Sequence, residues 1–184
     1  MGVRILIGAL LTIALSTGIV EAQPAPAQSV SAVSSSATVL NAAEVQKIFP
    51  PSVFFKGQTA SIQGRNSGGV RLADKRLVMI SLVDNSGYSS QVQERYQAYL
   101  ITETALEIDG HRLPAGTYGC GFLTGDSFVV MDVGGHDLFL AHSKRDDDMH
   151  RPTPLQVQAA TGEAGLYRLY AGRNFVTFRV AVGE

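Results

Sequence analysis

The sequence predicts a mainly β fold: a single antiparallel β-sandwich or barrel with one or two short helices, placed after a signal peptide and a flexible linker. Turn-forming residues recur about every ten positions, and the runs between them are apolar or alternate apolar with polar side chains. Hydrophobic residues make up 45% of the 184 residues and the formal net charge is -1, which is typical of a globular protein. This pattern does not distinguish a two-sheet sandwich from a closed barrel.

The N-terminal segment has the pattern of a secretory signal peptide. An arginine precedes the apolar run ILIGALLTIAL, and the motif VEA provides a cleavage site after Ala22. The next stretch, QPAPAQSVSAVSSSAT, is small, polar and proline-bearing, as flexible linkers are. We therefore expect a signal peptide over 1–22, a linker over 23–38 and a β-rich domain over 39–184, in a protein exported to the periplasm or outside the cell. No later stretch approaches ~18 continuous apolar residues, so we expect no integral membrane segment in the mature chain.

The segment that follows the linker begins with a predicted short helix. Asn41 is a suitable N-cap and Glu44 stands three residues later, which is the spacing of a capping box. Pro50 and Pro51 end this helical segment. Two short strands, SVFF and TASIQG, are expected next, and NSGGV at 66–70 is expected to be a turn.

The middle of the chain contains the most apolar predicted strand. Arg76–Val83 is almost continuously apolar, which predicts a strand buried on both faces. A polar loop follows, then one or two helical turns near Val92, and then a strand over about 97–108.

Three dipeptides predict hairpin turns in the second half of the chain: Asp109-Gly110, Gly125-Asp126 and Gly134-Gly135. Beyond them, LQVQAA, LYRLYA and NFVTFRVAV have the composition of strands.

The register of the predicted hairpins places the single cysteine in apolar surroundings. If the turn at Gly125-Asp126 contains two residues, Cys120 lies opposite Met131, and the Gly-Gly turn then sets Met131 opposite Leu138. These side chains would share one apolar face of the sheet. Burial in such surroundings raises the pKa of a thiol, so Cys120 is expected to be structural and unreactive.

The same register predicts a candidate ligand site on the other face of this strand. Gly119 and Gly121 leave that face bare, as glycine does where a backbone or a ligand approaches closely. Asp132 is expected across from Gly119, and Asp137 across from Asp132. Two opposed carboxylates repel each other unless a calcium ion, a shared proton or an arginine lies between them. Alternatively both lie at a solvated sheet end, where screening weakens the repulsion.

The polar loop after the buried strand is a second candidate site. Asp84, Tyr88, Glu94 and Arg95 are placed to line a pocket, because loops at the ends of central strands often carry function. The alternative is structural: Asp84 and Ser86 then only cap the next turn through backbone N–H groups.

Other patterns exclude several classes of function. The formal net charge is close to zero and the sequence has no basic stripe, so we do not expect a nucleic-acid-binding protein. The spacing of the histidines does not fit a zinc site, and the run of three aspartates does not fit an EF-hand loop. The sequence contains no nucleophile elbow, phosphate-binding loop or dinucleotide fingerprint, so no catalytic residue and no cofactor are expected.

The segment DGHRLPAGTYGCGF, residues 109–122, resembles the LPAGTYG hairpin of exported bacterial β-sandwich domains of unknown activity, such as transthyretin-like and collagen-adhesin B-type modules. The resemblance implies that Leu113 and Tyr118 belong to the core, that 114–116 form the turn, and that the domain is extracytoplasmic.

The function predicted from the sequence is an exported, non-enzymatic binding or envelope-associated domain. Its partner is an unknown protein or a small-molecule ligand. One version is a barrel that holds a ligand in its apolar interior, and another is a sandwich that docks a protein. The alternative is a small secreted hydrolase or calcium-binding protein that uses Asp132 and Asp137.

Overall fold

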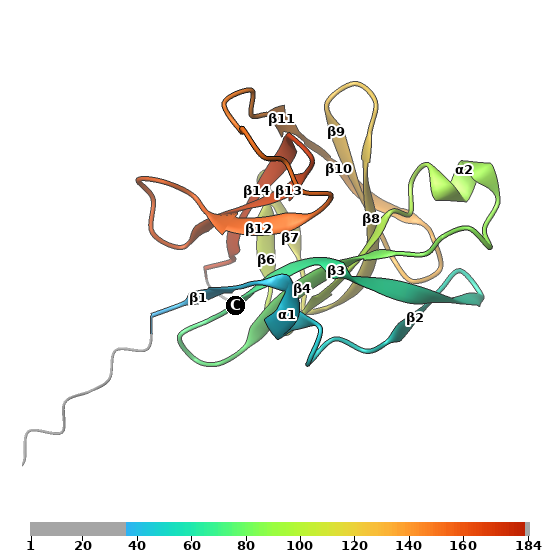
Figure 1. The fold of residues 1–184 in the computed structure, drawn as a ribbon, viewed down its shortest axis with the longest axis horizontal. Coiled ribbons are helices and arrows are strands. Elements are labelled where there is room, and N and C mark those ends of the chain that lie inside the picture. Colours follow the sequence, from blue (N-terminus) through green and yellow to red (C-terminus); the bar gives the residue numbers. More distant parts are fainter. Residues whose placement is uncertain (1–35, 183–184) are drawn as a thin grey trace, which may run out of the picture. The chain divides into compact units, whose positions relative to one another are not determined.

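The structure, a computed structural model, describes residues 36–182 as a mainly β domain with two antiparallel sheets and two short helices (Figure 1). This confirms the predicted fold class. The predicted signal peptide, 1–22, and most of the predicted linker, 23–38, lie outside the described residues. None of the helices in the described part of the chain has the length and hydropathy of a membrane span.

The larger sheet has eight strands. Its order is β1-β3-β4-β5-β8-β9-β10, with β2 paired to β3. The strands are β1 (Thr38–Leu40), β2 (Ser52–Phe55), β3 (Gln58–Arg71), β4 (Leu77–Val83), β5 (Ala98–Thr102), β8 (Gly116–Leu123), β9 (Ser127–Met131) and β10 (Asp137–His142).

The smaller sheet has six strands and the order β12-β13-β14-β6-β7, with β11 paired to β14. The strands are β6 (Leu106–Ile108), β7 (His111–Leu113), β11 (Lys144–Arg145), β12 (Gln156–Ala159), β13 (Leu166–Ala171) and β14 (Asn174–Val180). The two helices, α1 (Ala42–Val45) and α2 (Ser90–Gln93), both belong to segments that flank strands of the larger sheet.

The larger sheet has a hydrophobic core on each of its faces. The inner core lies between the two sheets and joins residues such as Ile80 of β4 to Val176 of β14. The outer core covers the opposite face, where Val45 of α1 and Phe55 of β2 pack with Met131 of β9. The central strand β4 contributes alternate residues to both cores, which confirms the prediction of a strand buried on both faces.

The inner core leaves no room for a ligand. The space between the sheets is lined by apolar side chains and has a volume of ≈20 Å³, about the size of one water molecule. The structure therefore does not support the version of the prediction in which a barrel encloses a ligand of ordinary size.

The first helix forms as predicted. The Asn41 side chain accepts a hydrogen bond from the backbone N–H of Glu44 at 3.1 Å, and the Glu44 carboxylate accepts one from the N–H of Asn41 at 2.9 Å. This reciprocal capping box satisfies two N–H groups that a helix N-terminus otherwise leaves free.

The segment predicted as one strand over 97–108 is two strands in different sheets, β5 and β6. The chain bends between them, where the Thr102 hydroxyl donates to the Thr104 carbonyl oxygen at 2.6 Å and accepts from its N–H at 3.3 Å. Alternation alone did not reveal this bend, because both halves keep apolar side chains at alternate positions.

The segment predicted as a turn at 66–70 instead continues β3 through the sheet. A Cβ atom on Gly69 would lie 2.5 Å from the Val78 carbonyl oxygen, and one on Gly68 would lie 2.8 Å from the backbone nitrogen of Val157. The two glycines therefore permit close approach of neighbouring backbones rather than a reversal of the chain.

The predicted register of Cys120 is wrong by one residue. The chain reverses at the predicted Gly-Asp dipeptide, but the loop contains three residues, 124–126, so Cys120 lies opposite Val130 rather than Met131. Because side chains alternate along a strand, Cys120 faces the inner core and Met131 faces the outer core.

The next hairpin agrees with the prediction only in part. Leu140 lies opposite Val129 as predicted, whereas Met131 lies opposite Asp137 rather than Leu138. A β-bulge just after Asp137 causes this difference.

The LPAGTYG segment is a connection between the sheets and not a hairpin. Strand β7 ends at Leu113 in the smaller sheet and β8 begins at Gly116 in the larger one, and the two strands do not pair. Leu113 and Tyr118 are buried as predicted, and the Tyr118 hydroxyl donates to the Pro114 carbonyl oxygen at 3.0 Å.

The Cys120 thiol is expected to be unreactive in the native protein. Its side chain is fully buried, and the loss of solvation raises its pKa above the ordinary value. A disulfide reagent such as DTNB should leave the native protein unlabelled at pH 8 and label it stoichiometrically in urea. Rapid labelling without denaturant would contradict the buried position.

Candidate functional site

The predicted opposition of Asp132 and Asp137 does not occur, because the three-residue loop and the bulge change the register. Asp132 lies in the β9–β10 turn, where it accepts a hydrogen bond from the His136 N–H at 2.9 Å and lies 3.0 Å from His136 Nδ1. Asp137 begins β10 and forms an ion pair with Arg95. Each carboxylate therefore has its own partner, and the calcium and hydrolase alternatives lose the opposition on which they depended.

The glycine face of β8 is covered by the protein itself. A Cβ atom on Gly119 would lie 2.3 Å from the Phe55 ring, and one on Gly121 would lie 2.3 Å from the Arg95 carbonyl oxygen. The predicted close approach is confirmed, but an aromatic ring and a backbone segment take the space proposed for a ligand.

Phe55 belongs to an aromatic cluster above this face. Its ring stacks on that of Tyr96 with centroids 3.9 Å apart, and Tyr88 meets Tyr96 edge-on at 5.4 Å. The Tyr96 hydroxyl is buried and has no hydrogen-bond partner within residues 36–182. Desolvation raises the pKa of this phenol, which keeps it neutral.

Two of the four predicted loop residues, Asp84 and Tyr88, have structural roles. Asp84 accepts a hydrogen bond from the Ser86 N–H at 3.2 Å, which is the turn-capping alternative. The Tyr88 hydroxyl donates its proton to the Phe55 carbonyl oxygen at 2.9 Å, and the Gln58 carbonyl oxygen lies 3.2 Å from the same hydroxyl. Neither side chain lines the pocket that lies beside the aromatic cluster.

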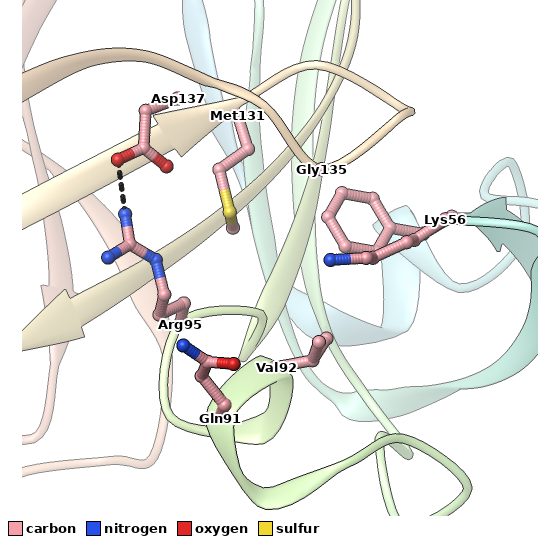
Figure 2. A pocket seen from close by; sticks show the side chains of 8 residues that line it. Lys56, Gln91, Val92, Arg95, Met131, Gly135 and Asp137 are labelled. Carbon is pink, nitrogen blue, oxygen red and sulfur yellow. Dashed lines mark hydrogen bonds and ion pairs between the residues drawn. The ribbon is translucent and has the colours of Figure 1, made fainter.

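A pocket of ≈250 Å³ lies beside this cluster, between the β2–β3 turn, α2 and the β9–β10 turn (Figure 2). It is lined by Phe55, Lys56, Gln91, Val92, Arg95, Met131, Gly135 and Asp137. Phe55 and Met131 are buried members of the outer core, so the pocket has an apolar floor.

The charged groups stand around this floor. Figure 2 shows the Lys56 ammonium directed into the pocket, with the Arg95–Asp137 ion pair on the opposite side. No carboxylate among the described residues forms an ion pair with Lys56, which leaves one positive charge in excess around the pocket. The backbone N–H of Lys56 donates to the Val133 carbonyl oxygen at 2.7 Å, which joins the β2–β3 turn to the β9–β10 turn.

Neutral amide side chains hold the loop that carries Arg95. Asn85 Nδ2 donates to the carbonyl oxygens of Gln93 at 3.1 Å and Tyr96 at 2.6 Å. The Gln97 amide donates to the Phe122 carbonyl oxygen at 2.9 Å and accepts from the Phe122 N–H at 3.1 Å, as a neighbouring strand would. The Arg95 side of the pocket is therefore fixed to β8.

Asp137 and Arg95 were predicted from the sequence as site residues, whereas Lys56 and Gln91 were not. Lys56-Gly57 forms the two-residue turn between β2 and β3, and both residues have positive φ, 47° and 79°. A Lys-Gly pair between two short strand candidates was the available signal. Nothing in the sequence indicated that this turn meets α2.

In the part of the chain that the structure describes, no three His, Cys, Asp or Glu side chains gather closely enough to hold a metal ion. The sequence matches no family model, and no curated protein and no solved structure is significantly similar to it.

Gly119→Ala is expected to destabilise the protein by about 1–3 kcal/mol, because the added methyl group overlaps the buried Phe55 ring. Gly87→Ala is the matched control: its methyl group would lie 3.8 Å from the nearest atom, and the change should stay within about 0.5 kcal/mol. Urea unfolding of both variants measures the difference. Equal stability would show that the ring does not rest on Gly119.

Asp132 is expected to titrate below its ordinary pKa of 3.8, mainly because the His136 N–H stabilises the carboxylate, with a further contribution from the imidazole. The stabilisation from this carboxylate is present above the unfolded-state pKa and is lost as the pH falls through the lower folded-state pKa. Carbon-detected NMR titration measures the pKa. His136→Ala keeps the backbone N–H, so most of the lowering should persist, whereas a wild-type value at or above 3.8 would contradict the geometry.

Proposed function

We propose that the chain is an exported, non-enzymatic binding domain whose ligand is a small molecule with a negative charge beside an apolar group. The ligand occupies the pocket between the β2–β3 turn, α2 and the β9–β10 turn. Export rests on the signal-peptide pattern of residues 1–22.

The observation that carries this proposal is the Lys56 ammonium, which is directed over an apolar floor and has no ion-pair partner among the described residues. An anionic group of the ligand supplies that partner, and charge-assisted hydrogen bonds are stronger than neutral ones. The buried Phe55 and Met131 beneath it favour an adjoining apolar group.

Isovalerate and its neutral analogue isovaleramide test the proposal, because the two differ chiefly in charge. In ¹H–¹⁵N NMR titrations of the purified protein, isovalerate should shift the amide signals of Lys56, Gln91 and Gly135. Isovaleramide should bind about fivefold more weakly, which is the size of one partly exposed ion pair.

Lys56→Gln should remove the preference for isovalerate. Lys75→Gln is the matched control, because Lys75 is also exposed and also has a positive φ, 73°, but does not line the pocket. Equal binding of the two probes, or equal loss in both variants, would contradict the proposal.

A further inference from the structure

A second hollow adjoins the pocket. Its volume is ≈520 Å³, and it shares Gln91 and Arg95 with the pocket, so these two side chains lie between the two spaces. The rest of its lining is Glu94, Gln97, Phe122, Leu123 and Thr124. A ligand longer than isovalerate can therefore extend from one space into the other past the end of α2.

The two spaces carry opposite unpaired charges. Lys56 lines the first and Glu94 the second, and neither forms an ion pair within residues 36–182. The charge between them is already balanced, because Arg95 pairs with Asp137. The complementary ligand has an anionic end and a cationic end.

The lining between Lys56 and Glu94 contains both a polar side chain and apolar side chains. The Gln91 amide makes no hydrogen bond to another described side chain or backbone group, and Figure 2 places it at the edge of the pocket. Met131 and Phe122 supply apolar surface in the two spaces. A fatty acid offers Gln91 and Glu94 no amide and no cation, whereas a peptide offers amides to the first and an ammonium to the second.

We propose that the site binds a short peptide with free ends, with its carboxylate at Lys56 and its ammonium at Glu94. This inference rests on the proposed function of the pocket. Gln91 bonds the peptide backbone, and the apolar floor accepts a side chain of the peptide.

The test uses the tripeptide Ala-Leu-Ala, its N-acetyl form and its C-terminal amide, with binding measured by NMR titration of the purified protein. Blocking either end should weaken binding about fivefold. Glu94→Gln should lose the sensitivity to acetylation and keep the sensitivity to amidation. Lys56→Gln should show the reverse, and Lys75→Gln should behave as the wild type.

The outcomes separate the two proposals. If amidation weakens binding and acetylation does not, the peptide assignment is overturned while the anion-binding pocket stands. If neither block matters and isovalerate binds no better than isovaleramide, both are overturned.

Discussion

The stacked rings of Phe55 and Tyr96 on the glycine face of β8 determine the arrangement of the outer half of the domain. Their centroids lie 3.9 Å apart, and the ring of Phe55 occupies the space that a side chain at position 119 would take. Lys56 follows Phe55 in the chain, and Arg95 precedes Tyr96. The same contact that closes the outer core therefore sets the two cations on opposite sides of the pocket.

The contact between Phe55 and Tyr96 helps to cover the second apolar face of the larger sheet. Antiparallel sheets often leave one face in water, but β4 and its neighbours present apolar side chains on both faces. The second sheet covers one face, and α1, β2 and the β4–β5 loop cover the other. The pocket lies at the edge of this outer cover, where α2 meets two turns that are distant from it in the sequence.

Local signals in the sequence predicted the elements more accurately than their pairing. Two predictions that rest on short stretches of sequence are confirmed: the capping box of Asn41 and Glu44, and the burial of β4 on both faces. The register of Cys120 depends on whether the loop after β8 has two residues or three, which the Gly-Asp dipeptide does not specify. The pocket unites residues 56, 91 and 137, and only tertiary packing brings these positions together.

The loop that presents Arg95 is held by Asn85 and Gln97, whose amides bond to backbone groups of the loop and of β8. An amide neither gains nor loses a proton across the physiological range and bears no net charge. Acidification or added salt consequently leaves these restraints in place. A dependence of ligand affinity on pH or ionic strength then reports charged groups, among them the Arg95–Asp137 ion pair and the Asp84 turn cap, and not the loss of these amide hydrogen bonds.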